Sequence, residues 1–237
     1  MPNRLDRFEM LVGKEALDSL KEKKVIIFGI GGVGGYVLEA LVRAGVGHIA
    51  IVDSDNIDIT NINRQIIATT EVVGLPKVDV AEKRAKSINP DVVITKFKHF
   101  YLPEDHGGIN LSDYDYVIDA IDTVKAKLDI IVECKTNNIP IISSMGAGNR
   151  LDPSKLVYAD VYKTSNDPFA KIMRKECRKA GITSLAVVYS TEEAIKPLEA
   201  QNANGRHIPG SSPFVPPAAG LMIASKVVRD LLEVKDE

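Results

Sequence analysis

Cysteine is scarce in this sequence, because Cys134 and Cys177 are the only two among 237 residues. Two thiols cannot supply a four-cysteine zinc site, so that class of structural metal centre is excluded. Cys134 follows Ile130 by four residues and lies on the apolar side of an expected helix. Cys177 stands in the same relation to Met173. We predict buried structural thiols at both positions, and a thioester or persulfide role for Cys177 is the alternative.

Long apolar runs and a strong net charge are also missing. No segment approaches the ~20 apolar residues that span a bilayer, and residues 1–11 lack the apolar centre of a signal peptide. We therefore expect a cytoplasmic protein without a membrane partner. The 30 Lys and Arg nearly balance the 32 Asp and Glu, which leaves a net charge of -2. Binding of nucleic acid would therefore depend on a local basic patch.

The most informative segment that is present is residues 23–34, which read KKVIIFGIGGVG. An apolar run that breaks into Gly29-x-Gly31-Gly32-x-Gly34 predicts a buried strand that turns into a helix. The first backbone N–H groups of such a helix face a phosphate, and glycine lets the backbone approach it closely. The motif alone does not distinguish NAD from another nucleotide.

The residues that follow favour ATP. Asp53 lies 24 residues beyond the first glycine of the motif and fits the ribose of NAD or of ATP equally well. Asn61, Arg64 and Gln65 then precede Lys77, at the start of an expected helix. Hydride transfer needs no such cations. A triphosphate that is attacked by a carboxylate does, since charge builds on its phosphoryl oxygens.

Taken together, these motifs resemble those of the ubiquitin-activating-like adenylyltransferase family, which includes the enzymes that activate sulfur carriers. The resemblance spans roughly residues 5–165. The matching motifs, in chain order, are GIGGVG, the D-x-D of Asp53 and Asp55, the N-x-x-R-Q of Asn61–Gln65, the G-x-x-K of Gly74–Lys77, and Asp119 and Asp122 in YVIDAIDT.

Hydrophobic patterning predicts an α/β fold with a Rossmann-like, doubly wound, mostly parallel sheet and a C-terminal extension that packs on it. One domain of residues 1–237 is expected, with a nucleotide-binding part at 22–150 and a substrate-binding part at 151–237. The expected strands are 24–28, 48–52, 92–97, 116–120, 139–143, 156–161 and 185–190. The expected helices are 9–21, 33–44, 77–88, 124–136, 167–180 and 217–233, with a mobile loop at 196–212.

Two segments of the second half, YSTEE (189–193) and GSSPFVPPAAGLMIASKVV (210–228), resemble the branch of the family that dehydrates threonylcarbamoyladenosine in tRNA. That resemblance implies that ATP activates the threonyl carboxylate and that an internal attack closes a ring, without an enzyme nucleophile. One alternative is an adenylyltransferase that activates the C-terminus of a ubiquitin-like sulfur carrier. Another is a nucleotide-sensing protein that has lost catalysis.

The family resemblance also implies roles for individual residues. ATP and Mg²⁺ are the implied cofactors, and a monovalent cation is left open. The implied partners are tRNA and a second copy of the chain, and a cysteine-desulfurase or sulfur-acceptor system is left open. Relatives carry an arginine that reaches the ATP site of the partner subunit, and this chain has Met10 at that position. Arg7, in preference to Arg4, is the expected substitute. The alternative is that either arginine is simply solvated. The remaining implied roles are backbone approach to the nucleotide for Gly29, Gly31, Gly32 and Gly34, ribose binding for Asp53, cofactor binding for Asp55, phosphate binding for Asn61, Arg64 and Lys77 supported by Gln65, a magnesium ligand in Asp122, and a partner behind it in Asp119. For Asp55 and Gln65, a purely structural hydrogen-bonding role is the alternative. The expected catalytic residues are Arg64, Lys77, Asp122 and Arg7.

The helix expected at 167–180 carries a basic face. Five cations recur at helical spacing, opposite an apolar face, and we predict that they contact tRNA. An ordinary solvated face, interrupted by Glu176, is the alternative. The four histidines have no metal-ligand partner at helical spacing. The five cations are Lys171, Arg174, Lys175, Arg178 and Lys179.

Overall fold

The computed structural model describes residues 3–196 and 209–234, and most of the loop that was expected to be mobile lies outside these residues. A seven-stranded sheet has the order β3-β2-β1-β4-β5-β7-β6. Its strands are parallel except for β6, which runs antiparallel to β7. The strands are β1 (Lys24–Phe28), β2 (His48–Val52), β3 (Val93–Phe97), β4 (Tyr116–Asp119), β5 (Ile141–Ser144), β6 (Leu156–Asp160) and β7 (Ala186–Ser190).

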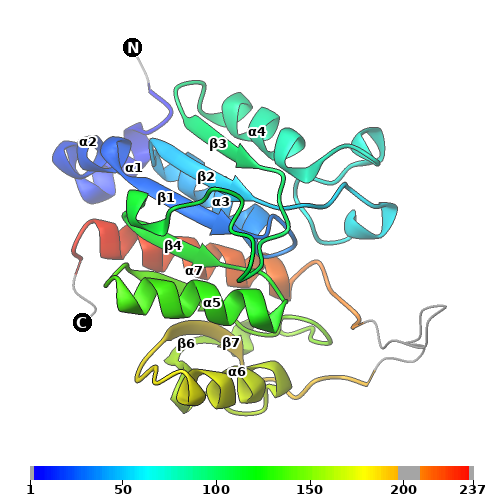
Figure 1. Cartoon of the computed structure of the whole chain (residues 1–237). Coiled ribbons are helices and arrows are strands. Elements are labelled where there is room, and N and C mark those ends of the chain that lie inside the picture. Colours follow the sequence, from blue (N-terminus) through cyan, green and yellow to red (C-terminus); the bar gives the residue numbers. More distant parts are fainter. Residues whose placement is uncertain (1–2, 197–208, 235–237) are drawn as a thin grey trace.

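Helices cover both faces of the sheet, as the apolar strands require (Figure 1). One face packs against α3, α4 and α7, with α2 at its end. The other face packs against α5 and α6. The predicted fold class is thereby confirmed, and the last helix does dock on the sheet. The helices are α1 (Asp6–Val12), α2 (Lys14–Glu22), α3 (Gly34–Ala44), α4 (Lys77–Ile88), α5 (Val124–Thr136), α6 (Pro168–Lys179) and α7 (Val215–Leu231).

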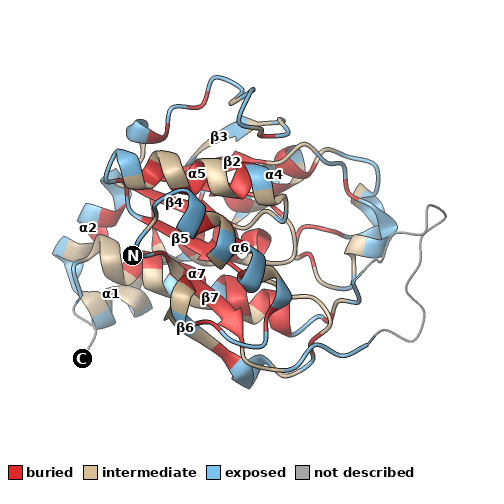
Figure 2. Ribbon diagram, turned by 60° about the horizontal axis from the view of Figure 1, so that its bottom comes forward, coloured by how far each residue is buried: buried red, intermediate tan, exposed pale blue. Residues whose placement is uncertain are grey.

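Burial follows from this layering. Figure 2 shows that the central strands are buried between the helix layers, whereas β3 at the edge of the sheet is partly exposed. The strands β6 and β7 from the second half extend the same sheet as the strands from the first half. None of the helices in the described part of the chain is long and apolar enough to cross a membrane.

The predicted helix at 9–21 is wrong in one respect, because the structure divides it into α1 and α2 at Gly13. Gly13 has a φ of 83°, which a right-handed helix cannot contain. The two cysteines, by contrast, are buried as predicted. Burial raises the pKa of the Cys134 thiol to about 12 and that of Cys177 to about 11. Neither thiol is therefore activated as a nucleophile.

Candidate active site

A cavity of about 620 Å³ opens at the carboxyl ends of β1, β2, β4 and β5. The strand order reverses between β1 and β4, and such a switch point is where open α/β sheets bind ligands. The topology therefore gathers side chains that are far apart in the sequence. Ten of the predicted site residues line the cavity: Gly29, Gly31, Gly32, Asp53, Asp55, Asn61, Arg64, Gln65, Lys77 and Asp122.

The glycine loop of residues 29–33, between β1 and α3, lines one side of the cavity. Gly29 has a φ of 86°, and a Cβ there would lie 2.9 Å from the carbonyl oxygen of Ala120. Gly34 does not line the cavity. A Cβ on Gly34 would lie 1.8 Å from the carbonyl oxygen of Gly29, so its role in this structure is the close packing of α3 on the loop.

Asp53 follows β2 and holds the glycine loop from the side. Its carboxylate accepts a hydrogen bond from the Ile30 N–H at 2.7 Å and one from the Asp55 N–H at 2.9 Å. Burial raises the pKa of Asp53, and the Lys77 ammonium is the strongest opposing influence. A carboxylate that is held in this way keeps lone pairs that can accept hydrogen bonds from ribose hydroxyls.

Lys77 is the first residue of α4, and its side chain is buried. Its Nζ lies 2.8 Å from Asp55 Oδ2 and 3.8 Å from Asp53 Oδ1. The Asp55 side chain is 64% exposed, so water can replace the lysine as its partner. The ammonium is therefore poised between two carboxylates at the cavity wall, where an anionic ligand can draw it away from Asp55.

The segment around a 3₁₀ turn at Ile59–Asn61 supplies further polar groups. Asn61 Oδ1 accepts a hydrogen bond from the Asp58 N–H at 3.1 Å, so only its amide N–H₂ is left for a phosphate. Arg64 Nη1 donates to the carbonyl oxygen of Thr60 at 2.9 Å. Gln65 is buried, and its Oε1 has no hydrogen-bond partner among the described residues. Such an orphaned acceptor in a cavity wall fits a ligand that donates a hydrogen bond.

Asp119 and Asp122 occupy different environments at the end of β4. Asp122 is exposed at the cavity and makes no hydrogen bond or ion pair with any residue that the structure describes. Asp119 is wholly buried, lies outside the cavity lining, and pairs with the equally buried Lys127 at 2.8 Å. Burial raises the pKa of Asp119, and the Lys127 ammonium opposes that rise. The sequence did not predict this buried pair, because nothing in the pattern around Lys127 distinguishes it from an exposed lysine on a helix.

Arg7 and Arg4 do not reach the cavity of their own chain. Arg7 is exposed on α1, which Figure 1 shows beside the amino ends of the strands. Arg4 is paired with Asp91 and hydrogen-bonds to Asn89, so it is engaged elsewhere. A role for either arginine would require a second copy of the chain.

Arg150 was not predicted, although it lines the cavity and is buried. Its Nη1 donates to the carbonyl oxygens of Gly146 and Gly148, at 2.8 and 3.1 Å. Its Nη2 has no hydrogen-bond partner among the described residues and lies 3.9 Å from Asp167. The position of the segment GAGNR, directly beyond the carboxyl end of β5, is the signal that could have found it.

The basic face of α6 is present but partly engaged. The Arg174 guanidinium donates to the Thr164 carbonyl oxygen at 2.8 Å. Arg178 lies over the ring of Tyr162, at 5.1 Å from its centroid. Lys179 pairs with Glu176 at 2.8 Å. The exposed Lys171 and Lys175 have no ion-pair partner among the described residues.

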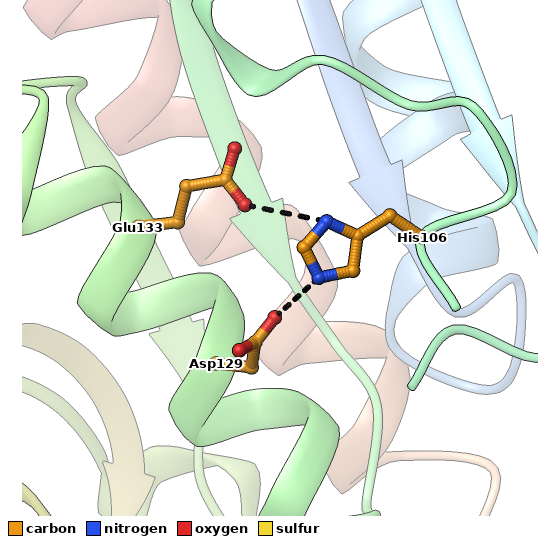
Figure 3. A group of neighbouring side chains, drawn as sticks. All are labelled: His106, Asp129 and Glu133. Atoms are coloured by element: carbon orange, nitrogen blue, oxygen red, sulfur yellow. Dashed lines mark ion pairs between the residues drawn. The ribbon is translucent and has the colours of Figure 1, made fainter. Parts of the chain in front are cut away.

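A second polar cluster joins the loop before β4 to α5 (Figure 3). His106 Nε2 lies 3.0 Å from Asp129 Oδ2, and its Nδ1 lies 3.9 Å from Glu133 Oε2. Tyr101 also lines the cavity, and its hydroxyl donates to Asp129 at 3.0 Å. The two ring nitrogens face different carboxylates, so the imidazole lies between Asp129 and Glu133. Sequence reasoning missed this cluster because its histidine and its carboxylates lie on separate elements.

The chain is similar to known proteins over nearly its whole length. Residues 5–237 match the ThiF family. The chain is 42% identical to the tRNA threonylcarbamoyladenosine dehydratase of Bacillus subtilis, over 98% of this chain and 96% of that protein. It is 34% identical to the Haemophilus influenzae protein of the same name, over 98% and 97%. The crystal structure of the Escherichia coli tRNA N6-threonylcarbamoyladenosine dehydratase in complex with ATP superposes with a TM-score of 0.86, at 32% identity, over 97% of this chain and 94% of that one.

Proposed function

This chain belongs to the ThiF family, and we propose that it uses ATP to dehydrate, and so to cyclise, N6-threonylcarbamoyladenosine beside the anticodon of tRNA. The observation that carries the proposal is the cavity at the strand switch point, which combines an acidic ribose acceptor with Arg64, Lys77 and Asp122. Similarity to dehydratases over nearly the whole chain supports this substrate over a sulfur-carrier protein. A cytoplasmic location suits an enzyme that acts on tRNA.

The reaction needs an activated carboxylate and little else. A threonyl carboxylate oxygen bonds to a phosphorus of ATP, and the bond from that phosphorus to its bridging oxygen breaks, so the leaving phosphate group takes the electron pair. An atom of the same substrate then attacks the carbonyl carbon and loses its proton to water. The carboxylate oxygen leaves with the phosphoryl group, and the net change is loss of water. No enzyme thiol takes part, which agrees with two buried cysteines.

The cavity residues supply binding and charge stabilisation. The N–H groups of the glycine loop face the phosphates, and Asp53 accepts hydrogen bonds from the ribose. Arg64 and Lys77 stabilise the charge that builds on the phosphoryl oxygens, with Asn61 donating from its amide. The Asp122 carboxylate is exposed and has no partner within the described part of the chain, so it fits a magnesium ligand, and the ion would neutralise phosphate charge there.

Two further parts of the proposal concern partners. We place tRNA on the basic face of α6, because Lys171 and Lys175, which have no ion-pair partner among the described residues, keep that face positive. We also propose a homodimer, in which Arg7 acts in the cavity of the partner copy. The exposed side chains of Met10 and Leu11 on α1, at 77% and 81%, give this helix an apolar surface to bury. A sulfur-transfer protein as a further partner is not required by this chemistry.

Mass spectrometry of nucleosides tests the function directly. Purified protein, ATP and tRNA that carries threonylcarbamoyladenosine should yield a nucleoside that is lighter by one water, and omission of ATP should abolish it. A parallel reaction with a sulfur-carrier protein should show no carrier-dependent exchange of pyrophosphate into ATP. An unchanged nucleoside together with carrier-dependent exchange would establish the alternative function.

A further inference from the structure

The loop of residues 120–123 carries Asp122 from the end of β4 to the start of α5. All four of its residues line the cavity, and Ala120 packs against Gly29 of the glycine loop. The Asp122 side chain has no partner of its own among the residues that the structure describes. Its position therefore depends on what holds the backbone of this loop.

The buried pair of Asp119 and Lys127 holds that backbone from behind. Lys127 Nζ donates to the carbonyl oxygen of Ile121 at 3.0 Å, and Asp119 Oδ1 accepts from the Ile121 N–H at 3.4 Å. The ion pair that links the two holding groups measures 2.8 Å, and both side chains are 0% exposed. Ser143 Oγ on β5 adds a hydrogen bond of 2.6 Å to Asp119. Both backbone polar groups of Ile121, the residue before Asp122, are thus held by one charged pair.

Stability alone does not account for this pair. Removal of two charges from water costs several kcal/mol for each ion, and well-packed apolar side chains in their place are often neutral or stabilising. The Lys127 ammonium also has little freedom to move. Asp119 and the Ile121 carbonyl contact it, and the centroid of the Phe169 ring lies 5.7 Å from it. A pair of this kind gives a precise backbone position at a cost in desolvation.

We propose that Lys127 is a positioning residue that, together with Asp119, fixes the loop of residues 120–123 so that Asp122 meets the metal of Mg²⁺–ATP. This inference rests on the proposed function, because that function is what supplies Mg²⁺–ATP as the ligand that Asp122 meets. Lys127 itself touches neither the nucleotide nor the metal. Its removal therefore weakens the use of metal while the glycine loop and Asp53 continue to bind the nucleotide.

The first test compares Lys127→Met with Lys125→Met, which changes an exposed lysine on the same helix. Lys127→Met should raise the half-saturating Mg²⁺ concentration and lower kcat, each about tenfold, since the loss of groups that orient a metal ligand typically costs 10 to 100-fold. ATP affinity in EDTA should stay within about twofold of the parent, because the nucleotide contacts are intact. Lys125→Met should match the parent in every respect.

A second variant removes both charges. It is needed because Lys127→Met leaves the buried Asp119 without its partner, which can prevent that single variant from folding. Asp119→Leu with Lys127→Met should fold, as thermal unfolding would show, and should still need about tenfold more Mg²⁺. Normal Mg²⁺ dependence in this folded variant would overturn the proposal.

A double-mutant cycle with Asp122→Asn separates positioning from general structure. Lys127→Met should reduce turnover less than about twofold in the Asp122→Asn background, because the group that it positions is already gone. An equal loss in both backgrounds would overturn the proposal. If the parent does not act on tRNA, the proposed function fails, and the double-mutant cycle is then measured as the Mn²⁺ affinity of the protein–ATP complex without tRNA.

This second cycle still decides the positioning role. A Mn²⁺ affinity that does not change in Asp122→Asn would refute that role.

Discussion

Replacement of Lys77 by methionine should affect ligand binding and stability in separable ways. A phosphate contact from an ammonium is a charge-assisted hydrogen bond, which contributes about 1.5–3 kcal/mol. At about 2 kcal/mol, its loss weakens ATP binding about 30-fold. Lys83, which is exposed on the same helix, provides the matched control variant Lys83→Met, and its ATP affinity should equal that of the parent.

The effect on stability follows from the two carboxylates beside Lys77. The contact with exposed Asp55 contributes at most about 1 kcal/mol. At 3.8 Å, attraction to the buried Asp53 amounts to about 4 kcal/mol for an effective dielectric constant of 20, and desolvation of the lysine offsets part of it. We therefore expect Lys77→Met to lower the free energy of unfolding by about 1–3 kcal/mol near neutral pH.

The loss should depend on pH with a definite sign. Burial already raises the pKa of Asp53 above its unfolded value, and removal of the strongest opposing charge raises it further. The folded state then binds more protons than the unfolded state between the two pKa values, so stability falls as pH rises through that window. Unfolding temperatures at a series of pH values should thus show a destabilisation that shrinks in acid. Unchanged ATP affinity in Lys77→Met would refute the phosphate role, and a loss that is independent of pH would refute the coupling to Asp53.

Four further predictions concern the rest of the molecule. Asp122→Asn should retain the parent's unfolding temperature but lose most turnover, because the proposed magnesium ligand is gone and a metal ion stabilises transition-state charge by several kcal/mol; near-normal turnover would remove Asp122 from the site. Cys134→Ala with Cys177→Ala should keep turnover and lose about 1 kcal/mol of stability per cavity, as urea unfolding would show, whereas lost turnover in a folded variant would revive a thioester mechanism. Lys171→Gln with Lys175→Gln should weaken tRNA binding and flatten its salt dependence without an effect on ATP affinity, and unchanged filter-binding curves would leave α6 as scaffold. Light scattering should report a dimer at micromolar concentration, and a stable monomer would contradict the role of Arg7 in trans.

The sequence predicted those parts of the site that lie in short, ordered motifs. The glycine loop, Asp53 and Lys77 each stand directly at the junction of a strand or loop with the next element. Parallel strands bring such junctions to one edge of the sheet, so chain order was enough to place them around one cavity. The same rule placed Asp122 beyond β4.

The parts that escaped prediction depend on contacts between distant elements or on competing local bonds. His106 meets Asp129 and Glu133 only because a loop folds over α5, and no periodicity records such an approach. The motif assigns Asn61 to phosphate but does not show that its Oδ1 caps the turn that follows Asp58, which leaves only the amide N–H₂ for that role. Local hydrogen bonds of this kind compete for a side chain in ways that a motif does not show.

The two buried lysines show why burial alone does not reveal function. Lys77 lies at the start of α4 and Lys127 near the start of α5, and each pairs with a carboxylate at 2.8 Å. The nearer partner of Lys77, Asp55, is 64% exposed, so water can solvate it if a phosphate draws the ammonium away, and the buried Asp53 lies farther off at 3.8 Å. The partner of Lys127 is wholly buried, so the same exchange would leave an uncompensated charge inside the protein. Lys77 is therefore free to respond to ligand, whereas Lys127 is held in place, and the exposure of the partner carboxylate distinguishes the two roles.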